Sequence, residues 1–230
     1  MGRAIPFDPV VLAEDGEVLI VDKPPFLPTT SNGRIVDETV QALLAQRHGP
    51  EVTCIHRLDL LTSGLLIVSL NKATRGTYQV MFQEHRVHKT YRCLTAEADW
   101  PIGETRTITV ELANVPAERG VRVRLDGAVV HGPQDEVTGW REATTVVTYE
   151  GEGQWLLKPV TGRTHQLRAT MTALGYPIIG DDTYPVDRGL KLYNFESVLH
   201  LVATELEYTD PLDGGARHWI STRDLYDPVG

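Results

Sequence analysis

A chain of 230 residues that is 41% hydrophobic and 23% charged has the composition of a folded domain, which excludes a disordered or fibrous protein. Its two cysteines, Cys54 and Cys93, cannot form a disulfide scaffold, and no Cys-x-x-Cys pair is present to bind zinc. No apolar run reaches the roughly 18 residues of a membrane span, and the N-terminal stretch is too acidic for a secretory signal. We therefore expect a cytoplasmic globular protein without a membrane partner.

The net charge of −9 opposes binding to nucleic acid, but this charge is unevenly distributed along the chain. Between Cys54 and Cys93 six basic residues outnumber two acidic ones, so this segment carries +4 and the rest of the chain −13. A local positive field can serve a polyanion, because salt at 0.1 M screens charges beyond about 10 Å. Charge alone nevertheless favours the plainer interpretation, in which the segment is a solvated surface.

The first half of the chain predicts strands interspersed with two helices. Residues 18–21 are a β-branched run ended by a proline-rich turn, which predicts a strand. Residues 37–47 have apolar side chains at helical spacing with acids in the first turn, and Asn71 is placed to cap a second helix. Further strands are predicted over residues 65–70 and 87–95.

The second half is mostly β, since apolar and polar residues alternate between residues 105 and 155. Asp126–Gly127 separates two such runs and predicts a hairpin. A helix over residues 164–174, with Thr164 as its cap, follows strands at 144–149 and 155–160 and precedes a strand at 200–208. The last twenty residues are polar and predict turns. The fold class is therefore α+β, mostly antiparallel, in one domain.

The densest group of reactive side chains is His-Arg-Leu-Asp-Leu-Leu-Thr-Ser-Gly at residues 56–64, between two predicted strands. Loops on a rigid sheet often carry catalysis, and an aspartate beside an arginine can serve as nucleophile or base. The alternative is a surface turn in which Asp59 and Thr62 bond the local backbone, and the isolated motif favours that alternative. Asp59 is one residue too late for a kinase His-Arg-Asp loop, and Ser63 lacks the glycine of a hydrolase elbow.

Two further segments carry candidate residues. Residues 161–168, Thr-Gly-Arg-Thr-His-Gln-Leu-Arg, open a predicted helix, and one of their arginines could pair with Asp59 while the other reaches a phosphate. The alternative is a helix start with two solvated arginines. Lys89 and Tyr91 lie two apart on a predicted strand and so share a face, although a lone tyrosine on a strand is more often core.

Taken together these motifs resemble the RluA-type pseudouridine synthases, which isomerise uridine in structured RNA. The match is ordered along about residues 15 to 212: Asp22-Lys23-Pro24, His56-Arg57-Leu58-Asp59 with Thr62-Ser63-Gly64, Lys89-Thr90-Tyr91, Gly162 to Arg168, Gly180-Asp181 and Leu199-His200. The resemblance implies a mixed, largely antiparallel bisected sheet with flanking helices and a central catalytic cleft. It also implies a monomer that needs no cofactor and no metal.

The resemblance assigns roles by position. Asp59 would be the catalytic aspartate, Tyr91 the tyrosine that stacks on the base, and Arg168 the arginine that pairs with the aspartate. Arg57 would fill the gap left by the flipped uridine, and Leu167 would line the pocket. The remaining substrate-binding residues are expected to be His56, Lys89, Arg163 and Thr62.

The sequence also departs from the family. Thr170 stands where the family has a histidine, and residues 97–141 fit poorly and are expected to be a recognition insertion. Residues 1–14 would be an N-terminal arm without an S4 module, and residues 15–230 the catalytic domain. The missing module and the negative charge favour a compact tRNA stem-loop over ribosomal RNA. The alternatives are an RNA-binding protein without catalysis and a hydrolase acting through Asp59, which would need metal ligands or a second carboxylate.

Overall fold

The computed structural model describes residues 5–31, 33, 35–116, 118–132, 137–189 and 193–229. The chain forms two compact units, one from Met1–Lys89 with Val202–Gly230 and one from Thr90–Leu201. Within the described residues no helix is long and apolar enough to span a membrane.

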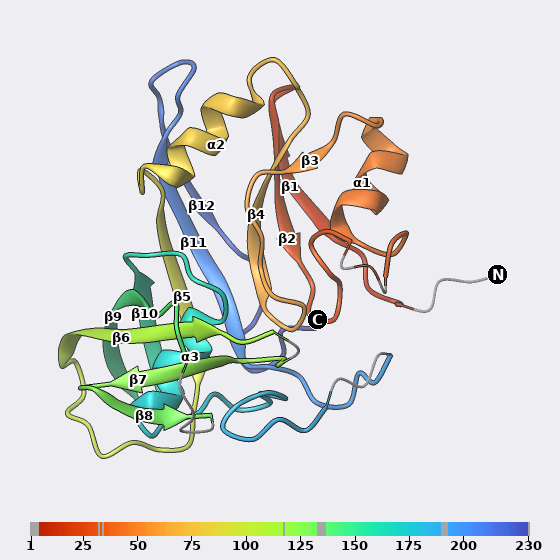
Figure 1. The fold of residues 1–230 in the computed structure, drawn as a ribbon. Helices are drawn as coiled ribbons and strands as arrows, with labels where there is room; N and C mark the ends of the chain where they lie inside the picture. Colours follow the sequence, from red (N-terminus) through yellow and green to blue (C-terminus); the bar gives the residue numbers. More distant parts are fainter. Residues whose placement is uncertain are drawn as a thin grey trace. The chain divides into compact units, whose positions relative to one another are not determined.

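Twelve strands and three helices lie within these described residues (Figure 1). In chain order they are β1 (Val10–Glu14), β2 (Val18–Lys23), α1 (Val40–His48), β3 (Thr53–Cys54), β4 (Ser63–Ser69), α2 (Arg75–Gln83), β5 (His88–Leu94), β6 (Thr105–Asn114), β7 (Val121–Leu125), β8 (Ala128–His131), β9 (Arg141–Gly151), β10 (Gln154–Pro159), α3 (Gln166–Ala173), β11 (Leu201–Thr209) and β12 (Ala216–Ile220).

The first unit is built on strands in the order β1-β2-β4-β11, with β3 beside β4 and β12 beside β11. All of these pairs are antiparallel except β4 with β11, which is parallel. Helix α2 buries Tyr78 and Met81 against apolar side chains of β2, β4 and β11. Strands β2 and β4 are buried along their whole length, so the loops at their ends stand on a rigid support.

The second unit has the strand order β5-β10-β9-β6-β7-β8, with each described pair antiparallel. Helix α3 packs on β6 and β7, where Ala169 joins a core that includes Val110 and Val123 (Figure 1). The hairpin predicted at Asp126–Gly127 is confirmed, since both residues have positive φ, 50° and 80°, and join β7 to β8.

The predicted fold class is confirmed as a mixed, mostly antiparallel sheet with few helices, but three local predictions are wrong. Ala216–Ile220 is a strand rather than a turn-rich tail, because it pairs with β11. Asn71 does not cap α2: its Oδ1 accepts from Ala73 N at 2.9 Å, and the helix begins only after Thr74. Thr164 does not cap α3, which begins after His165 without a side-chain cap.

Candidate active site

The predicted catalytic Asp59 lies in a tight turn just before β4, where Thr62 N donates to Asp59 O at 3.2 Å. The backbone on its N-terminal side is fixed by Thr29, whose hydroxyl donates to Leu58 O at 2.9 Å and accepts from Leu58 N at 3.2 Å. On its C-terminal side Leu60 O accepts from the ammonium of Lys23 at 3.1 Å. The backbone is therefore held on both sides of Asp59.

Lys23 is a charged residue that bonds directly to this turn. Its side chain is fully buried, and its ammonium also donates to Pro24 O and Leu27 O, both at 2.9 Å. Burial lowers the pKa of Lys23 to about 7, while the charge of Asp59 raises it and that of Arg223 lowers it. A lysine that carries a positive charge below this pKa thus lies within electrostatic range of the Asp59 carboxylate.

Gly64 ends the Thr-Ser-Gly part of the motif at a close approach of two strands. It has φ of +106°, and an added Cβ would lie 2.3 Å from Ala203 O of β11. A side chain at this position would push β11 away from the start of β4. The glycine is therefore required for the strand pairing that supports the Asp59 turn.

His56, which was predicted to contact substrate, makes its described contacts within the protein. Its Nε2 accepts from Ile67 N at 3.1 Å, and its ring stacks on Phe82 at 4.4 Å between ring centroids. Burial, reinforced by the charge of Lys89, lowers the pKa of His56 to about 3. The ring is therefore neutral near pH 7 and serves as an acceptor for the backbone of β4.

The other candidates of the first unit differ in exposure. Arg57 is exposed beside the Asp59 turn, whereas Thr62 is only 2% exposed. Lys89 is partly buried on β5, and this burial lowers the pKa of its ammonium. Of these three side chains, Arg57 is the one most open to a bulky partner.

In the second unit, Arg168 is buried and forms a fork with Asp181. Its Nε donates to Asp181 Oδ2 at 2.7 Å and its Nη2 to Asp181 Oδ1 at 2.6 Å, and Nη2 also donates to Asp182 Oδ1 at 3.1 Å. Burial would raise the pKa of Asp181, but the hydrogen bonds and charge of Arg168, with the N–H groups of Thr183 and Tyr184, lower it overall. This fork fixes the guanidinium plane. A pairing of Arg168 with Asp59 stays a prediction.

The turn that leads into α3 is held by Gln166. Its Oε1 accepts from Arg163 N at 3.0 Å and from the Thr161 hydroxyl at 2.8 Å, and its Nε2 donates to Thr144 O at 2.9 Å. These bonds attach the turn to β9 and leave the side chain of Arg163 at the surface. His165, the residue before Gln166, has φ of 52°, a strained conformation for a residue with a side chain.

The remaining candidates of this unit are apolar or aromatic. Leu167 and Tyr91 are each 8% exposed, Leu167 on α3 and Tyr91 on β5, where Tyr91 pairs with Leu157 of β10. Thr170, which replaces the expected histidine, is 1% exposed, and within the described part of the chain its hydroxyl has no hydrogen-bond partner. A buried hydroxyl without a partner costs stability without adding chemistry.

The predicted site residues thus fall into two groups. The first unit holds His56, Arg57, Asp59, Thr62 and Lys89, and the second holds Tyr91, Arg163, Leu167 and Arg168. Burial holds Thr62, Tyr91, Leu167 and Arg168, whereas the side chains of Arg57 and Arg163 are exposed. Assembly of both groups into one catalytic cleft stays a prediction.

The residues that support the Asp59 turn are only partly recognisable in the sequence. Lys23 belongs to the Asp-Lys-Pro motif, which by itself assigns it no role. Thr29 lies outside every motif, because it acts on Leu58, which is 29 residues further along the chain. A lysine directly before a proline, at the end of an apolar run, is the one clue to this support that the sequence offers.

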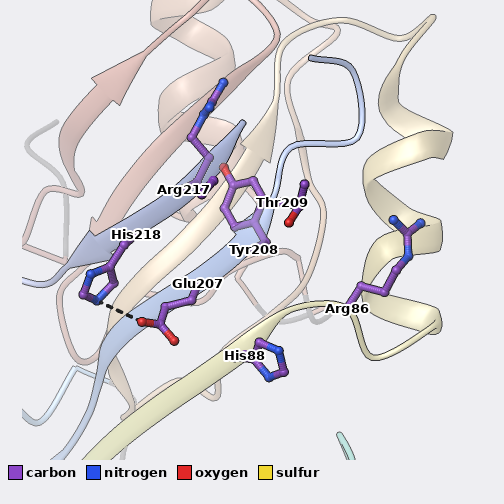
Figure 2. Close-up of a pocket in the computed structure, with 8 residues that line it drawn as sticks. Arg86, His88, Glu207, Tyr208, Thr209, Arg217 and His218 are labelled. Carbon is purple, nitrogen blue, oxygen red and sulfur yellow. Dashed lines mark ion pairs between the residues drawn. The ribbon is translucent and has the colours of Figure 1, made fainter. Parts of the chain in front are cut away.

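A pocket of about 380 Å³ lies elsewhere in the first unit, lined by residues of β11, β12 and the start of β5 (Figure 2). Two of its lining residues, Glu207 and His218, form with Glu205 the one group that could hold a metal within the described residues. His218 Nε2 lies 2.9 Å from Glu205 Oε2 and 3.6 Å from Glu207 Oε1, so the three side chains already pair with one another. None of the predicted site residues lines this pocket.

Comparison with known proteins identifies relatives along nearly the whole chain. The model of a family described as RNA pseudouridylate synthase matches residues 17–173. The dual-specificity RNA pseudouridine synthase RluA of Vibrio vulnificus (strain CMCP6) is 30% identical over 97% of this chain and 85% of its own. The tRNA pseudouridine(31) synthase of Saccharomyces cerevisiae is 28% identical over 80% of this chain and 47% of its own.

A solved structure shows the same similarity in three dimensions. The human RNA pseudouridylate synthase domain containing 1 superposes with a TM-score of 0.73 at 26% identity, covering 99% of this chain and 87% of that one. Human domain containing 4, at 20% identity and a TM-score of 0.66, shares the fold.

Proposed function

This chain belongs to the RNA pseudouridylate synthase family and converts uridine in RNA to pseudouridine, and we propose that Asp59 is the carboxylate on which this reaction depends. The observation that carries the proposal is the turn at Asp59, whose backbone is held by Thr29 on one side and by Lys23 on the other. A backbone held on both sides of Asp59 supports the positioning that a nucleophile or base requires.

The reaction needs only groups that the chain itself offers. The bond between C1′ and N1 of the uridine breaks with help from Asp59 at C1′, the base turns, and a new bond forms between C1′ and C5. The proton leaves C5 and N1 ends protonated, so there is no net oxidation or reduction. This balance agrees with the expectation of a reaction without cofactor or metal.

The other predicted residues would hold the flipped nucleotide. Tyr91 stacks on the base, Leu167 lines the pocket, and Arg57 fills the gap that the uridine leaves in the RNA. Flipping a base costs a few kcal/mol, which a stacking ring and a replacement side chain offset. Arg168 would face the carboxylate of Asp59. The remaining residues would contact the RNA or support side chains that contact it: His56, Lys89, Arg163 and Thr62.

The proposed substrate is a folded tRNA or ribosomal RNA, with a tRNA stem-loop favoured. The names of the relatives support both, since one is called dual-specificity and another acts on position 31 of tRNA. The chain's charge of −9 supports a compact RNA recognised by shape. We propose further that the protein acts as a monomer, with residues 15–230 as the catalytic domain.

The test is release of tritium from RNA labelled at uridine C5, with tRNA and ribosomal RNA assayed separately. We expect release from at least one pool by the wild type and a loss of about a thousandfold or more in Asp59→Ala and Asp59→Asn. Both variants should keep the thermal stability of the wild type within a few degrees. Substantial turnover by either variant contradicts the role of Asp59.

Two outcomes would instead favour the alternatives. Tight RNA binding by the wild type without any tritium release indicates a binding protein without catalysis. Free uracil among the products indicates hydrolysis of the glycosidic bond in place of isomerisation.

A further inference from the structure

A second set of contacts reaches the end of β2 from residues about 200 positions further along the chain. Asp22 is fully buried, and its carboxylate accepts from the Ser221 hydroxyl at 2.8 and 2.9 Å, from Thr222 N at 2.7 Å and from the Thr222 hydroxyl at 3.0 Å. Arg223 adds a bond from its Nη2 to Asp22 O at 3.4 Å and one from its Nη1 to Val229 O at 3.1 Å. We call Asp22, Ser221, Thr222 and Arg223 the β2 anchor.

The β2 anchor and the Asp59 turn are joined by two consecutive residues. Asp22 and Lys23 are neighbours on β2, and neighbouring side chains of a strand point to opposite faces. Asp22 is held by the anchor, whereas the ammonium of Lys23 reaches Leu60 O in the Asp59 turn. A shift at the end of β2 would therefore be transmitted to Leu60, directly beside Asp59.

The anchor also bears on the Asp59 turn through charge. Two charged groups act on buried Lys23: the carboxylate of Asp59 in the turn and the guanidinium of Arg223 in the segment after β12. The charge of Arg223 opposes protonation of Lys23, and the charge of Asp59 favours it. The charge of Arg223 therefore weakens the hold of Lys23 on its proton and sets only the pH at which Lys23 titrates. The positional support comes from the other contact of Arg223, the hydrogen bond from its Nη2 to Asp22 O at the end of β2.

We propose that Arg223 is a positioning residue for the pseudouridine synthase reaction, acting through the β2 anchor and Lys23 to hold the Asp59 turn in its productive geometry. The inference rests on the proposed function, because it takes Asp59 to be the catalytic carboxylate. Arg223 lies in a segment outside every motif that the chain shares with the family.

The experiment compares Arg223→Gln with wild type in the tritium-release assay, measuring kcat and KM separately and the pH profile of kcat. The matched control is Arg217→Gln on β12, an arginine of the same unit that pairs with Asp213 at the surface. We expect Arg223→Gln to lower kcat by about tenfold to a hundredfold, as for a misplaced catalytic group, with KM within about threefold. Arg217→Gln should keep wild-type kinetics.

The pH profile separates positioning from general loss of stability. If charged Lys23 holds Leu60 O, wild-type kcat falls as the pH rises past about 7, where Lys23 loses its proton. Removing the guanidinium of Arg223 removes a charge that lowers the pKa of Lys23, so the alkaline limb should move to higher pH. Arg223→Lys keeps the charge and should keep the limb in place.

A milder variant keeps the test decisive if Arg223→Gln folds poorly, as circular dichroism at the assay temperature would show. Ser221→Ala removes two contacts to Asp22 and should lower kcat in the same direction but by a smaller factor. A folded Arg223→Gln with wild-type kcat and pH profile, or a folded Ser221→Ala with wild-type kcat, overturns this inference and leaves the proposed function intact. A wild type without tritium release on any RNA overturns the proposed function, and the inference falls with it.

Discussion

At the scale of single residues, His56 and Asp59 belong to one motif but have different surroundings. His56 and Asp59 stand three apart in one motif, yet the ring of His56 bonds the backbone of β4 while Asp59 lies in the turn before that strand. His56 accepts from Ile67 N because its ring packs against Phe82, a residue distant in the sequence. That information is absent from a local pattern.

The lowered pKa of His56 makes a prediction about stability in acid. The pKa is about 3 in the folded protein and near 6.5 in the unfolded chain, so between these values the unfolded chain binds a proton that the folded protein refuses. The stability that neutral His56 contributes is therefore complete above pH 6.5 and is lost as the pH falls toward 3. His56→Phe retains a ring to stack on Phe82 but does not titrate.

Urea unfolding of wild type and His56→Phe at a series of pH values checks this. Between pH 6.5 and pH 4 we expect the free energy of unfolding of the wild type to fall more steeply than that of His56→Phe, by up to about 1.4 kcal/mol per pH unit. His85→Asn, which alters an exposed histidine of the same unit, should follow the wild-type curve. Parallel curves for wild type and His56→Phe would show that His56 binds its proton equally well in both states, and would contradict the lowered pKa.

At the scale of secondary structure elements, the strands with long apolar runs were predicted from the sequence, and the polar strand β12 was not. β2 and β4 are buried throughout, so their apolar runs identified them, and the Asp-Gly pair identified the β7–β8 hairpin. β12 alternates exposed and half-buried residues, including Arg217 and His218, and its strand state depends on pairing with β11. A partner strand outside the local sequence decides such a case.

Gly64 makes the prediction at this scale. A methyl group there would collide with Ala203 O and sit at a φ that disfavours side chains, so Gly64→Ala should lower the free energy of unfolding by about 3 kcal/mol or more. Gly76→Ala is the matched control, because Gly76 lies in α2 with open space around it and should gain up to about 1 kcal/mol. Chemical denaturation of both variants measures this, and equal stability of Gly64→Ala and wild type would contradict the close approach.

At the scale of the whole molecule, the chain carries −9 and yet must bind a polyanion. The predicted RNA contacts include three basic side chains, Arg57, Lys89 and Arg163. About three phosphate contacts give a slope of about −2 to −3 for log K against log salt concentration. Filter binding of an active tRNA or ribosomal RNA between 50 and 400 mM KCl would measure it, and a slope steeper than about −6 would reveal a further basic surface.

The organisation into two units was the feature least accessible to sequence reasoning. No linker or change of composition marks residue 89 or residue 202, where the chain passes between units. Nor could any local rule bring Asp22 to Ser221, because those residues are 199 positions apart. The motifs identified the family and the proposed catalytic residue, whereas the contacts that support that residue depend on long-range packing.

The β2 anchor also imposes an order on biosynthesis. The second unit is one continuous stretch, Thr90–Leu201, whereas the first needs residues from both before and after it. During translation the ribosome must therefore release residue 221 before Asp22 can meet Ser221, by which time the second unit has all its residues. The Asp59 turn would thus acquire its final support late, so that a nascent chain interrupted before residue 221 would be expected to lack a competent site.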